Sequence, residues 1–445
     1  MKRFLIFAIL LVLIVVFAGP ALSVEQKGTS AKIPYPMGVE NITLQRQKVD
    51  ITVYSNFIKV EGEYLVRNEN RQEVTATFGF PFYRHSEMDR GEFPPMGLQV
   101  LQRKKDQDYF VRRTLEGDPS NGAFKEWYLW EVDIAPGRNG FFRVEYYLRL
   151  SRDQGIPFFS YGQSQSRAYA GSIIQTDIDV NMGIDCRDLP MVAQPDFSGR
   201  NYLYASLPSP RIQRNILSWS FKNHLPLEDL SIYFYRDGYP DWLVESSDTE
   251  PGMASSAQNV FDGDIRTSWV SPPENKGVGS YLVFTPVIRD NKSNTRPFEP
   301  VVREIGLVPG NTATLSSFYN YSHLMEGIVE VLIIKPEIPE EDREKPAKPQ
   351  KSSIRKSEKV DMPGHVKPVD LAEERKKKKD RPDVIMIDCL ADPVMQFFTA
   401  KQPLMTRNGP LRLMVTMVYP GQQFSELCIS QVLIIDRDPR QIYEY

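Results

Sequence analysis

Residues 127–150 read WYLWEVDIAPGRNGFFRVEYYLRL and contain the clearest structural signal in the chain. Apolar and polar side chains alternate over 127–134 and again over 141–150, and the intervening PGRNG is rich in residues that favour tight turns. A period of two places alternate side chains on opposite faces of a strand, so one face is expected on a core and the other in water. The stretch therefore predicts an antiparallel β-hairpin.

Similar alternation recurs at 49–53, 58–66 and 74–80, and residues 216–235 contain two more apolar segments joined by Asn-His-Leu-Pro. Many short strands separated by turn signals favour an all-β, antiparallel sandwich. Two stretches are distinctive, NFIKVEGEYLVRN (56–68) and ILSWSFKNHLPLEDLSIYFY (216–235). Through them, residues 40–236 resemble an uncharacterised family of exported bacterial sandwiches of the immunoglobulin-like or vault type. It implies a fold that would serve as a scaffold or protein-interaction module, and it implies no activity.

The first 23 residues have the organisation of a signal peptide. Lys2 and Arg3 precede an apolar run over 4–18, and Ala21-Leu22-Ser23 supplies small residues where a signal peptidase cuts. We expect cleavage after Ser23, a flexible leader over 24–39, and a location in the periplasm or outside the cell. The alternative is an uncleaved membrane anchor, because the apolar run approaches the ~17 residues that can span a bilayer.

Length and composition narrow the possible functions. The 445 residues suffice for two or three domains of ~100–200 residues each. The net charge of −3 gives no basic field that would recruit nucleic acid. One Cys389–Cys428 bridge is an alternative to three buried free thiols. The four histidines are not at ligand spacing, so we expect no metal site, and we expect no cofactor.

A second distinctive stretch, ESSDTEPGMASSAQNVFDGDIRTSWVSP, covers 245–272 and follows a polar linker predicted at 237–244. It resembles the opening of a discoidin-like, or coagulation-factor type C, domain. The residues that carry this likeness are Ser246, Ser247, Ala254, Ala257, Asn259, Asp262, Gly263, Asp264, Thr267 and Trp269. Trp269 is large enough to plug one end of a sandwich. Asp262 and Asp264 are too few for Ca²⁺, which takes six to eight oxygens.

The later segments GVGSYL (277–282) and LRLMVTMVYPGQQFSELCISQVLIID (411–436) narrow the likeness. They are similar to the bacterial discoidin-like subtype called the NADase-type glycan-binding domain. The resemblance implies a jelly-roll sandwich over 245–440 that recognises glycans. Two positions depart from the family pattern: Met325-Glu326-Gly327 replaces an Asn-Asn-Arg-like stretch, and Ser430-Gln431 replaces Ser-Glu.

Residues 337–383 interrupt this second domain with a segment rich in Lys, Glu and Pro. Such a composition buries too little apolar area to offset chain entropy, so it predicts a disordered, charged insert. Contact of Lys376 to Lys379 with anionic lipid or envelope polymers is one hypothesis. A solvated run compensated by Glu373 and Glu374 is the other.

Sugar binding by a sandwich needs exposed aromatic faces and convergent hydrogen-bonding groups on end loops. The aromatic run at 318–321, with one asparagine upstream, is the candidate loop. The predicted ligand-binding residues are Asn311, Phe318, Tyr319, Asn320 and Tyr321. The alternative is that alternate members of this run pack inward.

We expect a binding protein and no enzyme, since no nucleophile–base pair or Gly-x-Ser-x-Gly elbow occurs in the sequence. The expected partner is a glycan or another envelope polymer, bound passively by preformed end loops. The membrane is expected as a partner only through the signal segment, if that is uncleaved. The alternative function is a structural or assembly protein of the cell envelope that contacts an envelope protein. The replacement of the Asn-Asn-Arg-like stretch by Met325-Glu326-Gly327 favours this alternative.

Overall fold

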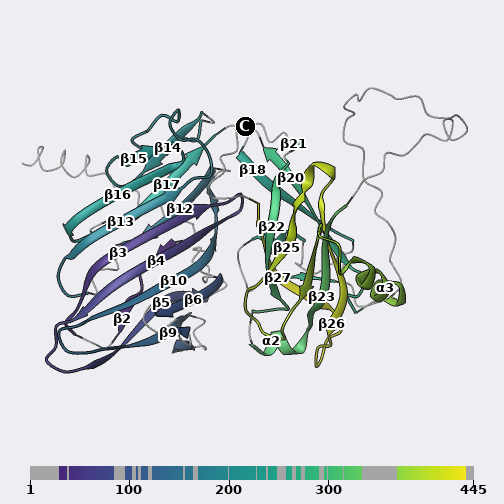
Figure 1. The fold of residues 1–445 in the computed structure, drawn as a ribbon, viewed down its shortest axis with the longest axis horizontal. Helices are drawn as coiled ribbons and strands as arrows, with labels where there is room; N and C mark the ends of the chain where they lie inside the picture. Colours follow the sequence, from purple (N-terminus) through teal and green to yellow (C-terminus); the bar gives the residue numbers. More distant parts are fainter. Residues whose placement is uncertain are drawn as a thin grey trace, which may run out of the picture.

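The computed structural model describes two β-rich domains that lie side by side (Figure 1). The described residues are 30–37, 40–84, 96–102, 107–108, 112–118, 123–153, 156–163, 169–198, 200–226, 228–236, 239–247, 257–262, 267–271, 276–289, 295–297, 299–313, 315–332 and 368–436. The predicted all-β architecture is confirmed, since strands account for most of the described chain. Among the described residues, no helix has the length and apolarity to cross a membrane. The predicted signal peptide at 1–23 lies outside these residues.

The first domain is built on one long, eight-stranded sheet. Its strands follow the order β15 (Arg211–Gln213), β16 (Ile216–His224), β13 (Ile173–Asn181), β3 (Ile42–Val53), β4 (Phe57–Asn68), β10 (Asn139–Arg149), β6 (Met96–Gln102) and β7 (Gln107–Asp108). Strands β3 and β13 run parallel, and β3 and β4 form a long antiparallel hairpin. Buried and more exposed side chains alternate along most of β3 and β4, so one face of the sheet packs on the core and the other lies toward solvent.

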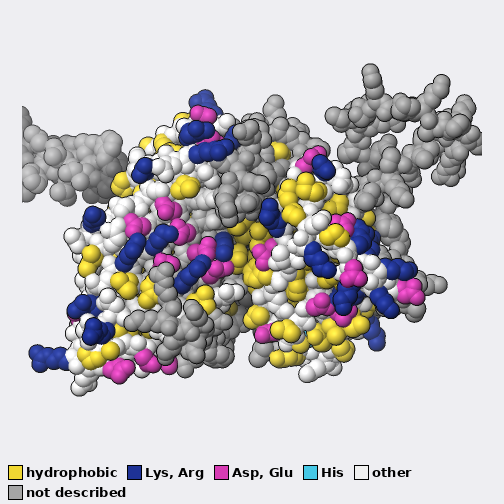
Figure 2. Space-filling model, viewed as in Figure 1, with side chains coloured by type: hydrophobic (Ala, Val, Ile, Leu, Met, Phe, Trp, Pro, Cys, Tyr) yellow, Lys and Arg dark blue, Asp and Glu magenta, His cyan; other side chains and the backbone are white. Residues whose placement is uncertain are grey.

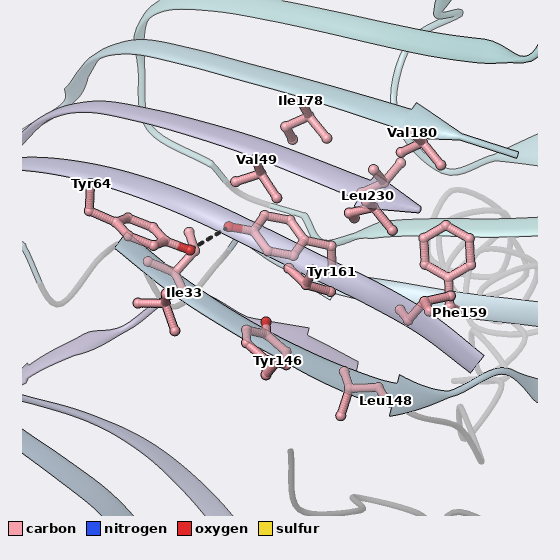
Figure 3. Close-up of a cluster of buried hydrophobic side chains, with 14 of the residues drawn as sticks. Ile33, Val49, Tyr64, Tyr146, Leu148, Phe159, Tyr161, Ile178, Val180 and Leu230 are labelled. Carbon is pink, nitrogen blue, oxygen red and sulfur yellow. Dashed lines mark hydrogen bonds between the residues drawn. The ribbon is translucent and has the colours of Figure 1, made fainter. Parts of the chain in front are cut away.

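Two smaller sheets complete the first domain. One contains β1 (Ser30–Lys32), β12 (Ile156–Gly162), β17 (Leu230–Tyr235) and β14 (Tyr202–Ala205), with β11 (Ser151–Asp153) paired to β12. The other contains β2 (Tyr35–Met37), β5 (Val74–Arg84), β9 (Ala123–Ile134) and β8 (Arg112–Asp118). The core lies between these sheets and the long one, and Figure 3 shows Val49, Tyr64 and Ile178 of the long sheet facing Phe159 and Tyr161 of β12.

The prediction of a β-hairpin over 127–150 is wrong, although both of the predicted strands form. Strand β9 pairs with β5 and β8, whereas β10 pairs with β4 and β6, so the tight turn at Gly137 carries the chain from one sheet to another. The inward faces of the two strands then meet across the core, where the rings of Trp130 and Phe142 lie 5.8 Å apart. Alternation identifies each strand and its buried face, but not the strand it pairs with.

The leader predicted as flexible over 24–39 contains two strands instead. Strand β1 pairs in parallel with β12, and β2 pairs with β5. Ile33, between them, is fully buried in the core. Backbone pairing at a sheet edge accepts a polar sequence, because the hydrogen bonds come from the main chain.

The second domain is a single sheet folded around its own core. Its strands follow the order β18 (Tyr239–Ser246), β20 (Tyr281–Arg289), β26 (Leu411–Tyr419), β23 (Ser322–Val331), β27 (Leu427–Ile435), β22 (Val301–Pro309) and β25 (Gln396–Met405). Three further strands attach to this path: β19 (Trp269–Val270) to β27, β21 (Thr295–Pro297) to β20, and β24 (Val384–Asp388) to β23. The core collects buried side chains from the first and last strands alike.

The strand β18 begins before the predicted start of this domain. Residues 239–244, assigned to the linker at 237–244, form most of β18 and pair with β20. Trp242 is 2% exposed, so its burial explains why a polar, turn-rich sequence becomes a strand. Trp269 is fully buried at β19, which pairs with β27. The segments around Trp269 and Tyr419 therefore belong to one folding unit.

The insert predicted as disordered over 337–383 ends in an ordered helix. Residues 333–367 lie outside the described residues, but α3 (Pro368–Lys378) packs on the second domain with Leu371 fully buried. Arg375 donates to the carbonyls of Gly327 and Ile387 at 3.0 and 3.2 Å. Lys378 forms an ion pair with Glu330 at 2.8 Å.

Helix α3 also changes the interpretation of the lysine run at its end. Because Lys378 is mostly buried, the run is not uniformly solvated. Lys376, Lys377 and Lys379 are exposed, and Lys377 lies 3.5 Å from Glu373 one helical turn earlier. Spacing of i, i+4 and i+7 places Leu371, Arg375 and Lys378 on one helix face, which is why this charged segment docks.

A closed interface joins the two domains. One buried cluster contains side chains of both domains. The first domain contributes Tyr54, Phe57, Met96 and Tyr147, and the second contributes Val308, Met395 and Leu433. The rings of Tyr147 and Phe397 lie 5.1 Å apart across this boundary.

The carboxylate of Asp436 is the polar centre of this interface. It accepts hydrogen bonds from Ser55 Oγ at 2.5 Å and from Trp242 Nε1 at 3.0 Å. Ser55 belongs to the first domain and Trp242 to the second, and both are buried. The same side chain therefore completes the fold of one domain and fastens it to the other.

Candidate functional site

The candidate loop lies at one end of the second domain, where two connections meet. The first connection is α2 (Leu315–Asn320), a short helix that leads into β23, and the second is the loop 420–426 between β26 and β27. Figure 1 places α2 at the lower end of this domain. Hydrophobic side chains gather on the surface at that end (Figure 2).

Backbone hydrogen bonds hold the two connections together. The amides of Gln422 and Phe424 donate to the carbonyls of Tyr319 and Asn320 at 3.0 and 2.9 Å. The amide of Ser322 donates to the carbonyl of Glu426 at 3.1 Å. The site is therefore preformed, because its backbone groups are already paired within the protein.

Gly421 is the residue that allows this close approach. A Cβ atom at this position would collide with the backbone oxygens of Asn320 and Phe424. Its amide donates to Ser322 Oγ at 3.1 Å. The Pro420-Gly421 pair therefore explains locally why the loop folds onto α2.

Three aromatic side chains form the surface of the site, and we call Tyr319, Tyr321 and Phe424 the aromatic tip. Tyr319 is 44% exposed and Phe424 is 41% exposed. The rings of Tyr321 and Phe424 stack at 4.6 Å with 25° between their planes. Gln422 and Gln423 beside them are exposed. Aromatic rings can stack on the apolar face of a ligand, while the neighbouring carboxamides form hydrogen bonds with the polar groups of that ligand.

The five predicted ligand-binding residues do not share one role. Tyr319 is exposed and Tyr321 half-buried on the surface of the tip, whereas Phe318 is fully buried. Phe318 packs on the ring of His323 at 4.3 Å. Asn320 Nδ2 donates to Ser316 Oγ at 3.3 Å.

The upstream asparagine serves its own loop. Asn311 Oδ1 accepts from the amide of Ala313 at 3.1 Å, which is the geometry of an Asx turn. Gly310 just before it lies against Phe318 and His323. Asn311 therefore supports the backbone behind the site. Phe424 belongs to the tip but was not predicted from the sequence. The signal that could have indicated it is the Pro420-Gly421 turn, which Phe424 follows by three residues.

The layer beneath the tip is neutral. His323 is 4% exposed and lies between the rings of Phe318 and Tyr419, at 4.3 and 5.1 Å. Burial lowers the pKa of His323, outweighing the hydrogen bond to the Tyr321 carbonyl. The tip therefore rests on an uncharged aromatic and imidazole layer near neutral pH.

Gln431, at one of the positions that depart from the discoidin-like pattern, has structural partners. Gln431, 1% exposed, donates from Nε2 to Asp262 Oδ1 at 2.9 Å and to the carbonyl of Asn259 at 3.1 Å. Thr267 Oγ1 donates to the other oxygen of Asp262. Within the described part of the chain, no three His, Cys, Asp or Glu side chains gather as metal ligands, and Asp264 lies outside it.

The three thiols are buried and free. No bridge joins Cys389 to Cys428, and Cys186 is also unpaired. Burial raises the pKa of each thiol to about 12. Protonated, inaccessible thiols are typical of structural cysteines.

Comparison with known proteins adds little to this geometry. No family model matches the chain, and no curated protein has significant sequence similarity to it. Among solved structures, one similar chain comes from Legionella pneumophila and is provisionally described as a nutrient binding protein. It is 17% identical with a TM-score of 0.37, over 46% of this chain and 70% of that one. A likeness this distant leaves function to be argued from the chain's own residues.

Proposed function

We propose that this protein binds a carbohydrate or another uncharged envelope polymer through the aromatic tip of its second domain. The observation that carries the proposal is the stacked Tyr321–Phe424 pair beside exposed Tyr319. These rings lie where α2 and the loop 420–426 are held together by backbone hydrogen bonds. Sugars present apolar C–H faces and hydroxyl groups, which match aromatic rings and the neighbouring glutamines. Binding is passive and involves no covalent step.

The proposal includes export from the cytoplasm and retention in the bacterial envelope. The support is the signal-peptide organisation of residues 1–23 and the likeness of 245–440 to discoidin-like, glycan-binding modules. A single small tip gives weak affinity for one sugar unit, so retention on a polymer would depend on repeated units. The first domain then acts as a scaffold fixed to the recognition domain through the Asp436 interface.

The test is a glycan array and a polysaccharide pull-down with the purified full chain. The wild type should retain a defined glycan class, and Tyr319→Ala and Tyr321→Ala should release it. Silence against every glycan, together with recovery of one defined envelope protein, would instead establish the structural or assembly role. Turnover of a panel substrate that is lost on changing one carboxylate would contradict a non-catalytic function.

A further inference from the structure

The inner face of the long sheet carries a polar row in the middle of an apolar core. Thr176 on β13 lies opposite Gln47 on β3, and Gln47 lies opposite Tyr64 on β4. All three side chains are fully buried. The next row along the same strands is apolar, with Ile178 opposite Val49. Polar side chains on three adjacent strands in register are unusual at this depth.

The facing sheet contributes polar side chains at the same end of the domain. Tyr161 on β12 places its hydroxyl 3.3 Å from that of Tyr64, and Figure 3 shows the two rings pointing toward each other between the sheets. Gln163 follows Tyr161 by two residues and is also fully buried. Gln163 directly follows the last residue of β12, and the alternation of that strand, if continued by one residue, directs it to the same side as Tyr161.

Most of these polar atoms have no hydrogen-bond partner among the described residues. They are Oε1 and Nε2 of Gln47, Oε1 and Nε2 of Gln163, and Oγ1 of Thr176. The tyrosine pair adds another group, since only one of its two hydroxyls can donate in a single hydrogen bond. Nearly all buried polar groups in folded proteins are hydrogen-bonded, so the unmet groups of Gln47 and Thr176, which are neighbours in register, call for a ligand.

Gly62 sets the direction of the Tyr64 ring. A Cβ atom on Gly62 would lie 2.5 Å from the hydroxyl oxygen of Tyr64, so the Tyr64 ring lies flat over this glycine. Gly62 is paired with Val49, one row beyond Gln47. The ring is thus directed along its strand and away from Gln47 and Thr176.

We propose that Gln47, Thr176 and Gln163 form a buried binding site for a neutral hydrogen-bonding ligand, and that ordered water occupies it. The row contains carboxamides and hydroxyls but no charged side chain, so an ion buried there would lack a counter-charge, which favours a neutral ligand. Burial also raises the pKa of Tyr64 and of Tyr161, which keeps both phenols protonated. A water molecule that makes about three hydrogen bonds satisfies groups of this kind.

The direct test is a high-resolution crystal structure of the full chain. Discrete density within hydrogen-bonding distance of Gln47, Thr176 and Gln163 is the expected result. Separate peaks identify water, and continuous density identifies a small neutral solute that uses the same groups. Carboxamides that bond to other protein groups, with no density between them, would overturn the proposal.

An isosteric variant gives an independent test in solution. Thr176→Val removes one hydrogen-bond partner of the bound water without changing the shape of the side chain. The melting temperature should therefore fall by about 2–4 °C. Thr52→Val, on the outward face of β3, is the matched control and should change it little. A rise in melting temperature for Thr176→Val would mean that its hydroxyl has no partner, and the site would be rejected.

Discussion

Replacing Asp436 with alanine tests how the two domains are held together. The change removes the acceptor of two hydrogen bonds, from Ser55 Oγ and Trp242 Nε1. Both donors are buried, and each would lose its hydrogen bond to this carboxylate. Each such loss costs about 1–3 kcal/mol, so Asp436→Ala should lower the free energy of unfolding by about 2–6 kcal/mol.

Urea denaturation followed by tryptophan fluorescence measures this loss, with two variants for comparison. Asp436→Asn keeps one side-chain oxygen as acceptor and should cost less than Asp436→Ala. Asp392→Ala removes an exposed aspartate from the same domain and should stay within about 0.5 kcal/mol of the wild type. If Asp436→Ala unfolds at the wild-type urea concentration, Asp436 does not fasten the interface.

Three further predictions concern the tip, the docked helix and the thiols. Gly421→Ala forces a Cβ into backbone oxygens, so it should destabilise the protein by about 1–3 kcal/mol in denaturant titration and weaken glycan retention; unchanged stability would argue against the close approach of the two loops. Burial opposes ionisation of Glu330, but hydrogen bonds from Lys378 and Arg412 outweigh it and lower the pKa below 4.5. The stabilising effect of ionised Glu330 is therefore present above pH 4.5 and lost as the pH falls through the lowered pKa. The melting temperatures of the wild type and Glu330→Gln should converge in acid. A difference between them that widens in acid would contradict the lowered pKa. Native protein at pH 8 should resist alkylation by iodoacetamide, counted by intact mass, while denatured protein should take three groups; rapid native labelling would show that a thiol is exposed.

Sequence patterns predicted the strands better than their partners. The alternation at 127–134 and 141–150 identified β9 and β10 and their buried faces. A hairpin and a crossing between two sheets bury the same side chains, so alternation could not distinguish them. The pairing depends on other strands, because β5 and β8 flank β9 whereas β4 and β6 flank β10.

Composition was least informative where a few residues decide the outcome. The charged insert looks disordered on average, yet Leu371, Arg375 and Lys378 suffice to dock α3. The same holds for the aromatic tip. The run at 318–321 indicated the right end of the domain, but the contribution of Phe424 depends on a loop about a hundred residues away folding back.

The most direct test of ligand recognition by the tip compares two phenylalanines that are equally exposed. Phe424 of the tip and Phe197 of the first domain are each 41% exposed, so truncating either removes a similar surface. Isothermal titration with the glycan retained on the array should show affinity reduced about tenfold or more for Phe424→Ala, which corresponds to about 1.4 kcal/mol. Phe197→Ala should bind as the wild type does. Equal affinity of all three proteins would contradict recognition by the tip.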